Sequence, residues 1–395
     1  MKSHKILMIP GPIEFDPEVL AAVGRPTTSH NDPSFIEAFG ASLEMMRDVF
    51  LSVDGQPFIV PGSGTLAMDA VAANLVEPGD AVLMLNTGYF SDRYTEILKR
   101  YGGQVTELVA PIGATVALED VENALRQKSY KLLVFTHVET STGVINDVPS
   151  LVNLAQKYQA ISVVDGICSI GAEEFRMSEW KVDVALTASQ KALGVPPGLA
   201  LWMVSPHALE VFKRRSTPVM NYYCDWNKWL PVMQSHEARK PDYFGTPAIN
   251  LVWGLYTSLQ LILKEEMEQR FSRHQLLSRA FKAAVTAWEL DQIPLKPEYA
   301  AHTVTAVRYP KGVEAASLLP EVAKQGIIIS GGLHPKIKNE YFRVGHMGTT
   351  SFGDLMATIS AVENALQVCG YAVSPGSGLA AAQAELWRTK AGSTS

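Results

Sequence analysis

Residues 182–204 read VDVALTASQKALGVPPGLALWMV, and this stretch decides the fold expected for the whole chain. Residues 184–187 and 199–204 are apolar without alternation, which is typical of strands covered on both faces. The link between them is too short for a crossover helix, so the two strands are expected to form an antiparallel hairpin. Lys191 lies inside this link, which places a charged group between two buried strands.

The chain before this hairpin alternates between strand-like and helix-like segments. Further apolar strands are expected at residues 58–60, 81–85, 105–109, 132–136 and 161–164. Helical patterns lie between most of them, at residues 65–75, 94–101, 118–127 and 150–158. The alternation predicts an α/β fold built on a large, mostly parallel sheet of seven strands, five here and two in the hairpin.

The chain after the hairpin predicts a smaller C-terminal α/β domain. Residues 206–247 are expected to be an irregular connection, followed by a long helical stretch at 251–290. The segments beyond it are strand-like at 303–309, 326–330 and 341–345, and helix-like at 315–324 and 351–367. The expected division is an N-terminal segment near the functional site (1–20), a large domain (21–260), a small domain (261–372) and a mobile tail (373–395).

Composition excludes several classes of protein. The chain has 395 residues and is 47% hydrophobic, which is enough for a large core. Its net charge of -6 and the lack of a basic stripe exclude nucleic acid as a partner. No run of about 18 apolar residues could span a membrane. The N-terminus fits neither a signal peptide nor a transit peptide.

The three cysteines have no CxxC spacing. They therefore indicate a reducing compartment, and neither a disulfide framework nor a metal site is expected. The chain does not end in the peroxisomal signal Ser-Lys-Leu. We expect a soluble intracellular protein, in the cytoplasm first, with the peroxisome and the mitochondrion left open.

Residues 61–65, Pro-Gly-Ser-Gly-Thr, follow an expected strand and open an expected helix. Glycines let the backbone approach an anion, and the free N–H groups of a helix N-terminus attract one. An ordinary glycine turn with a serine or threonine cap stays open as the alternative. The stretch matches neither GxxxxGK[ST] nor GxGxxG, so it is no Walker loop and no dinucleotide fingerprint.

Asp165 ends the apolar strand expected at 161–164. In open α/β sheets, ligands bind at the carboxyl ends of the strands. A carboxylate there can bind a metal, a ribose hydroxyl or a protonated ring nitrogen. It can also simply cap the next loop.

Lys191 is flanked by Ala-Ser-Gln and Ala-Leu-Gly, and no GxSxG motif competes with it as a nucleophile. Most lysines are solvated surface charges. Apolar surroundings, however, lower the pKa of a lysine and make it nucleophilic.

Pyridoxal phosphate needs an anion site, a strand-end carboxylate and a lysine together. It carries a phosphate, a ring nitrogen that must stay protonated, and an aldehyde that condenses with lysine.

Several motifs together resemble the class V aminotransferases of the fold-type-I pyridoxal-phosphate enzymes. They are residues 62–66 (GSGTL), 87–93 (TGYFSDR), 136–143 (THVETSTG), 164–165 (VD), 168–171 (CSIG) and 185–192 (ALTASQKA). The resemblance runs from residue 9 to residue 348. It implies a fold-type-I transferase whose large domain binds pyridoxal 5′-phosphate and whose activity is transamination.

The resemblance implies a role for each cofactor-binding residue. Lys191 would bind the cofactor covalently and later shuttle the substrate proton, while Asp165 would pair with the pyridinium nitrogen. The phosphate would be held by Ser63, Gly64 and Thr65, with Gln190 beside it.

Two further residues of the motifs would contact the cofactor ring. Phe90 would stack on the ring, at a position where the family often has tryptophan. Thr140 would place a hydroxyl near the ring, where some relatives have serine.

The resemblance also implies a second subunit and a substrate site. Tyr243 and Thr246, in YFGTP, match positions that reach the phosphate from the other subunit of a homodimer with shared sites. On the residues alone, an ordinary loop stays open. Arg343, in YFRVG, matches the arginine that pairs with the substrate carboxylate. A surface arginine on a strand is the alternative. Gly11 would bring backbone close to the substrate.

The implied substrates are an amino acid and a keto acid, with L-alanine and glyoxylate giving pyruvate and glycine. Serine with pyruvate or glyoxylate, or an aminophosphonate, stays open as the donor, because pocket shape decides the choice. A cysteine desulfurase is disfavoured, since no cysteine lies near Arg343 in the sequence. The intact Lys191, Asp165 and Arg343 disfavour a non-catalytic cofactor-binding protein. The missing GxGxxG disfavours a dehydrogenase.

Overall fold

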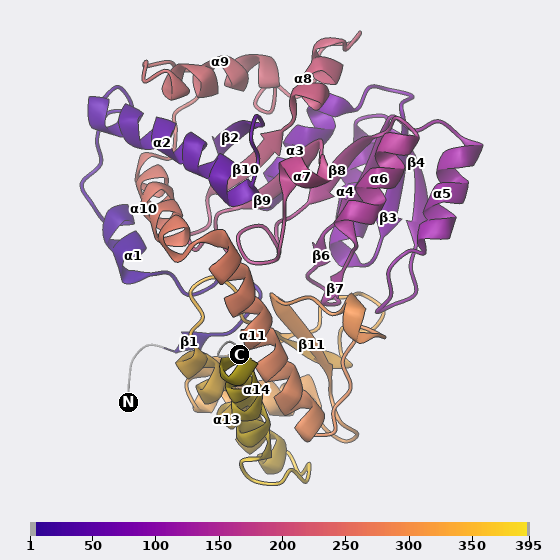
Figure 1. The fold of residues 1–395 in the computed structure, drawn as a ribbon, viewed down its shortest axis with the longest axis vertical. Coiled ribbons are helices and arrows are strands. Elements are labelled where there is room, and N and C mark those ends of the chain that lie inside the picture. The colour runs from indigo at the N-terminus through magenta and orange to yellow at the C-terminus, as the bar shows by residue number, and fades with distance from the viewer. Residues whose placement is uncertain (1–4, 393–395) are drawn as a thin grey trace.

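The computed structural model describes residues 5–392, which form a larger upper body and a smaller lower body in the view of Figure 1. Helix α11 (Met267–Ala287) runs from the upper body into the lower one. Both bodies combine helices with a sheet, as the sequence predicted.

The upper body is built on a seven-stranded sheet with the order β2-β10-β9-β8-β5-β3-β4. Its strands are β2 (Gln56–Pro61), β3 (Ala81–Asn86), β4 (Gln104–Val109), β5 (Leu132–Thr136), β8 (Ile161–Asp165), β9 (Val184–Ala188) and β10 (Leu199–Val204). Strand β10 is antiparallel to both of its neighbours, and the other strands pair in parallel. The predicted α/β class, the seven strands and the hairpin around Lys191 are confirmed.

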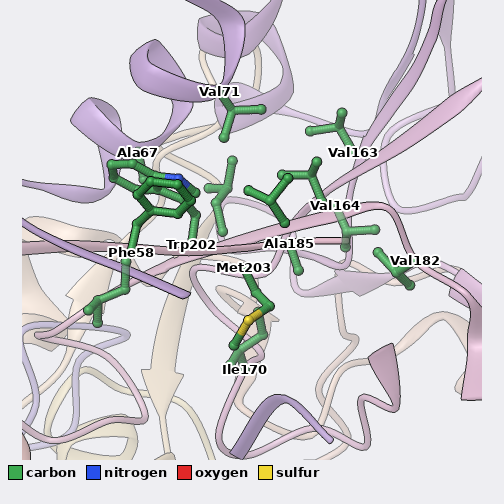
Figure 2. Packing of buried hydrophobic residues seen from close by; sticks show 14 of the residues in the cluster. Phe58, Ala67, Val71, Val163, Val164, Ile170, Val182, Ala185, Trp202 and Met203 are labelled. Carbon is green, nitrogen blue, oxygen red and sulfur yellow. The ribbon is translucent and has the colours of Figure 1, made fainter. Parts of the chain in front are cut away.

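Helices cover this sheet, so its central strands are buried on both faces. They include α2 (Pro33–Phe50), α3 (Gly64–Leu75), α4 (Tyr89–Arg100), α5 (Leu118–Gln127), α6 (Val148–Lys157) and α7 (Met177–Trp180). Helix α1 (Pro17–Val23) packs instead on α10 (Ile249–Glu265). Figure 2 shows part of the core, where Phe58 stacks on Trp202 with 5.1 Å between the ring centroids. Such close packing holds the strand ends, and therefore the residues that follow them, in fixed positions.

The lower body is built on a three-stranded antiparallel sheet, β11-β14-β13. Its elements are β11 (Val304–Arg308), α12 (Ala315–Lys324), β13 (Ser330–Gly331), β14 (Tyr341–Gly345) and α13 (Phe352–Val368), with η1 (Pro297–Tyr299) before them. Strand β1 (Ile6–Leu7) pairs in parallel with β12 (Ile327–Ile328). The N-terminal segment is therefore anchored on the lower body.

A short hairpin follows β5, at the carboxyl end of the large sheet. Its strands are β6 (Val138–Glu139) and β7 (Val144–Ile145), and they pair antiparallel. The hairpin carries the motif residues 139–143 at its turn, next to the strand ends.

Residues 206–247 are not the irregular connection that the sequence predicted. They contain α8 (Pro206–Lys213) and α9 (Trp226–Glu237), each begun by a side-chain cap. Trp226 and Trp229 of α9 are buried in the core, whereas the tyrosines of this segment are exposed. Tertiary packing therefore decides the structure of this segment.

The long helical stretch expected before the small domain is two helices, α10 (Ile249–Glu265) and α11 (Met267–Ala287). The residue between them has a positive φ of 66°, which breaks the helix. Within α11, Phe271 belongs to the hydrophobic core of the upper body, and Leu277 belongs to the core of the lower body. We therefore propose a domain boundary in α11 instead of the one expected at 260–261, which falls inside α10.

The tail expected to be mobile at 373–395 is helical within the described residues. Helix α14 (Ser377–Gly392) buries Ala382 completely. The carboxylate of Glu363 accepts a hydrogen bond from the Gly378 N–H at 2.9 Å. The alanine content of the segment favours a helix once one face is packed. Residues 393–395 lie outside the described residues, as do residues 1–4 of the expected N-terminal segment.

Candidate active site

A cavity of about 150 Å³ lies at the carboxyl ends of the central strands. Most of the residues predicted for the site line it together: Gly11, Ser63, Gly64, Thr65, Phe90, Thr140, Asp165, Gln190 and Lys191. They come from segments that are far apart in the sequence and that follow different strands. The sheet therefore gathers the predicted groups at one place, as the rule for open α/β sheets requires.

Lys191 lies three residues after the end of β9 and is only 8% exposed. Its Nζ donates a hydrogen bond to the carbonyl of Pro10. The next residue, Gly11, has φ +107°, and a Cβ there would come within 2.6 Å of Lys191 Cδ. Burial lowers the pKa of the Lys191 ammonium. A larger share of neutral amine, which is the nucleophilic form, follows from that shift.

Asp165 is the last residue of β8 and is buried. Its Oδ1 accepts a hydrogen bond from the Ile167 N–H at 2.9 Å. Burial raises the pKa of Asp165 to about 7, because the ionised form loses its water. A buried carboxylate is costly when ionised unless a cation lies against it, and a protonated ring nitrogen is such a cation.

The first residues of α3 present an open helix end to the cavity. Ser63 is the N-cap residue, but its side chain makes no capping hydrogen bond. A Cβ at Gly64 would come within 2.6 Å of Ile167 Cδ1, so only glycine leaves this space free. The buried Oε1 of Gln190 has no hydrogen-bond partner within residues 5–392. Open N–H donors are suited to an anion such as a phosphate. The unpaired Gln190 oxygen is an acceptor, so only the N–H₂ end of its amide could donate to one.

Phe90 is positioned by an acidic residue that the sequence analysis did not single out. Helix α4 begins at Tyr89, five residues before the expected start at residue 94, and its N-cap glycine offers no side chain. The carboxylate of Glu139, on β6, accepts hydrogen bonds from Phe90 N at 3.1 Å and Ser91 N at 3.2 Å. This carboxylate supplies the missing cap and fixes where the Phe90 ring lies.

Arg343 lies on β14 and is 8% exposed. Its Nε donates to the Gly331 carbonyl at 3.0 Å and its Nη1 to the Thr140 carbonyl at 3.1 Å. The pKa of Lys191 is lowered by burial first and also by the charge of Arg343, so the two cations are neighbours. Arg343 therefore stands beside the cavity, joined to its wall through Thr140.

Tyr243 and Thr246 are not brought to the cavity of their own chain. Both are exposed, and their side-chain oxygens lie 3.2 Å from each other. A role toward the phosphate from another subunit stays a prediction.

Five cavity-lining residues were not predicted for the site: Met68, Arg93, Val138, Ile167 and Cys168. Arg93, Val138 and Cys168 stand inside the motifs that carried the resemblance, and that was the only signal for them. Burial raises the pKa of the Cys168 thiol, which keeps it neutral. Val138, Ile167 and Met68 make the wall apolar.

Between residues 5 and 392, no three His, Cys, Asp or Glu side chains lie together as a metal site would require. Over the same residues, no helix combines the length and the apolar character needed to cross a bilayer.

The family model for class V aminotransferases matches residues 19–361. The chain belongs to the class V aminotransferases. Pyridoxal 5′-phosphate is therefore its cofactor. The buried amine, the desolvated carboxylate and the open helix end described above all fit that group.

Relatives of this aminotransferase carry different donor names. It is 37% identical to alanine–glyoxylate aminotransferase 1 of Saccharomyces cerevisiae, over 89% of this chain and 94% of the relative. It is 34% identical to serine–glyoxylate aminotransferase of Arabidopsis thaliana, over 96% of this chain and 94% of the relative. It is 33% identical to L-aspartate–glyoxylate aminotransferase of Paracoccus denitrificans, over 99% and 98%.

A solved structure has the same fold along nearly the whole chain. The ureidoglycine–glyoxylate aminotransferase of Bacillus subtilis superimposes with a TM-score of 0.90 at 27% identity, covering 98% of this chain and 99% of the other. The predicted fold-type-I architecture and the cofactor are thus confirmed.

Proposed function

We propose that this aminotransferase moves the amino group of L-alanine to glyoxylate, giving pyruvate and glycine. The observation that carries the proposal is the buried amine of Lys191 in one cavity with Asp165, next to the guanidinium of Arg343. The apolar wall formed by Val138 and Ile167 suits a donor with a small, uncharged side chain. The name of the yeast relative supports alanine and glyoxylate.

Each residue has a separate task in this reaction. Pyridoxal phosphate supplies the aldehyde that takes up the amino group and the ring that accepts electrons. Arg343 pairs with the carboxylate of the amino acid and thereby orients its α-carbon. Lys191 Nζ would hold the resting cofactor and, once free, would move the proton between the α-carbon of the amino acid and the aldehyde carbon of the cofactor. Asp165 holds the proton on the ring nitrogen.

The same groups serve both halves of the reaction. The donor leaves as a keto acid after giving up its amino group, and the acceptor then enters the same place with its carboxylate on Arg343. Burial of Lys191 and Asp165 keeps bulk water away from the proton transfers. Each half-reaction would give off one water as an amine condenses with a carbonyl and consume one as the product is released. Atoms balance over the cycle, because one amino group is exchanged for one carbonyl oxygen.

Serine is the second candidate donor, and one observation favours it. The side chain of Thr140 lines the cavity, and a hydroxyl there offers a partner to the hydroxyl of serine. Serine–glyoxylate and L-aspartate–glyoxylate aminotransferases are also among the relatives. Serine–pyruvate exchange and 2-aminoethylphosphonate as the donor are further alternatives within the same chemistry.

A homodimer with shared sites completes the proposal. Tyr243 is 56% exposed, and nearby in the sequence Met220 and Tyr222 are 84% and 73% exposed. Large apolar side chains exposed in one region are typical of a subunit interface. A second copy packed there would bring Tyr243 and Thr246 to the neighbouring phosphate site.

The test follows the cofactor through each half-reaction. Purified protein is mixed with L-alanine, L-serine or L-aspartate in separate cuvettes, and the visible absorption band of the bound cofactor is recorded. We expect the band to bleach fastest with L-alanine and to return on addition of glyoxylate. Faster bleaching with L-serine or L-aspartate would change the donor. A band that no amino acid bleaches would contradict transamination.

A further inference from the structure

Arg93 is a cation inside the cavity that the proposed chemistry does not use. It lies on α4, one turn after Phe90, and it lines the cavity. Its Nη1 donates a hydrogen bond to Thr65 Oγ1 at 3.0 Å. Its guanidinium carbon lies 5.0 Å from the centroid of the Phe90 ring. Arg93 therefore connects the open end of α3 with the ring that would stack on the cofactor.

The charge of Arg93 has no carboxylate against it. Its other polar contact is a long one, from Nη2 to Tyr89 Oη at 3.4 Å, and within residues 5–392 it forms no ion pair. Burial raises the pKa of Asp165, which lines the same cavity, and the charge of Arg93 lowers it, but the two form no ion pair. The other neighbouring acids have partners elsewhere. Asp92 accepts from Asn86, and the oxygens of Glu139 accept from the start of α4.

The proposed phosphate site lacks a cation of its own. Its residues, Ser63, Gly64, Thr65 and Gln190, are all neutral at physiological pH. The partial charge of a helix N-terminus is roughly half an elementary charge, whereas a phosphate carries between one and two negative charges. A guanidinium bonded to Thr65 stands where the remaining charge is needed, and its planar donors suit phosphate oxygens.

We propose that Arg93 supplies the positive charge of the phosphate end of this site. The inference rests on the proposed function, since it takes the open end of α3 as the place of the cofactor phosphate. It also sharpens substrate choice. With Arg93 committed to the phosphate, Arg343 is left to bind a substrate carboxylate, which favours a monocarboxylic donor over L-aspartate.

The experiment compares two ligands that differ only in the phosphate. Dissociation constants of pyridoxal phosphate and of pyridoxal are measured on the apoprotein by tryptophan fluorescence, for the wild type and for Arg93→Gln. We expect Arg93→Gln to raise the dissociation constant of pyridoxal phosphate about 10- to 100-fold, the range for a lost charged hydrogen bond. Pyridoxal should change by less than about twofold, because it carries no phosphate charge.

Two variants control the measurement. Arg93→Lys keeps the charge and should recover most of the affinity for pyridoxal phosphate. Arg100→Gln removes an arginine from the same helix, whose side chain is 74% exposed and pairs with Glu96, and should leave both constants unchanged. Thermal unfolding of the apoproteins checks that Arg93→Gln folds like Arg100→Gln.

Three results would overturn the proposal. Equal weakening of both ligands would mean that Arg93 acts only through the Phe90 ring. Unchanged constants would mean that it has no role in binding. Unchanged constants together with a selective loss of L-aspartate turnover would make Arg93 a substrate residue. If the wild-type apoprotein bound neither ligand, the proposed function itself would fail, which separates the two failures.

Discussion

Helices α3 and α4 begin at the same edge of the same sheet, yet their first turns are used in opposite ways. Helix α3 follows β2 and starts after Ser63, whose side chain makes no capping bond. Helix α4 follows β3 and starts after Gly88, and the N–H groups of its first turn donate to the buried carboxylate of Glu139. One helix end is open to the cavity, and the other is filled by the protein itself.

The difference shows how the chain separates binding from positioning. Both first turns carry a partial positive charge that attracts an anion. At α3 no side chain among residues 5–392 caps the helix start, so an external phosphate can bind there. At α4 an internal carboxylate does so, and the helix is held firmly enough to place Phe90 and Arg93 in the cavity wall.

Removing the carboxylate of Glu139 should cause the largest loss of unfolding free energy. In Glu139→Ala, the N–H groups of Phe90 and Ser91 and the Ser141 hydroxyl, now 2.7 Å from Glu139 Oε1, lose their acceptor. Buried donors left without partners should cost about 3–5 kcal/mol of unfolding free energy. Urea unfolding of the apoprotein measures it. Glu119→Ala, an exposed carboxylate in the first turn of α5, should cost no more than about 0.5 kcal/mol. Equal costs for the two variants would break the distinction between the two helix ends.

The second prediction concerns Asp165, which faces the open end across the cavity. Its pKa of about 7 is raised by burial, so the folded apoprotein holds a proton that the unfolded chain releases at lower pH. The unfolding free energy of the apoprotein should therefore fall as pH rises toward 7, by about 1.4 kcal/mol per unit, and then level off. The unfolding free energy of Asp165→Asn should not decrease in this way with pH. At pH 8 its apoprotein should therefore have a higher melting temperature than the wild-type apoprotein.

With the cofactor bound, the wild type should instead have a higher melting temperature than Asp165→Asn. The ring nitrogen then pairs with the ionised carboxylate, and the Asn variant cannot form this pair. Melting temperatures at pH 8, with and without pyridoxal phosphate, give both comparisons. A wild-type apoprotein that melts above Asp165→Asn at pH 8 would contradict the desolvated carboxylate.

The smallest change in unfolding free energy is expected for a substitution at the open end of α3. A serine that caps a helix is worth about 1 kcal/mol over alanine. Ser63 makes no capping bond, so Ser63→Ala should change the unfolding free energy of the apoprotein by less than about 0.5 kcal/mol. Ser351 caps α13 through the Asp354 N–H at 3.1 Å, so Ser351→Ala should show the full cost. Chemical denaturation of both variants decides it, and equal costs would mean that the end of α3 is capped after all.

The two helix starts also show what the sequence could predict. The start of α3 was predicted within one residue, because the glycine turn and the helix are adjacent in the chain. The start of α4 was placed five residues late, since its cap comes from Glu139, 50 residues downstream of Tyr89 (139 − 89). Local patterns identified Asp165, the last residue of β8, and Lys191, three residues after β9. The role that we propose for Arg93 rests on its contact with Thr65 of another helix, which no local sequence pattern predicts.

The most direct test of the account is to find the lysine that binds the cofactor. The protein loaded with pyridoxal phosphate is reduced with borohydride and digested, and the modified peptide is identified by mass spectrometry. We expect the label on Lys191, and no label in Lys191→Ala. Lys282 is the strongest competitor, because burial lowers its pKa to about 8. A label on Lys282, or one that persists in Lys191→Ala, would contradict the assignment of this cavity as the active site.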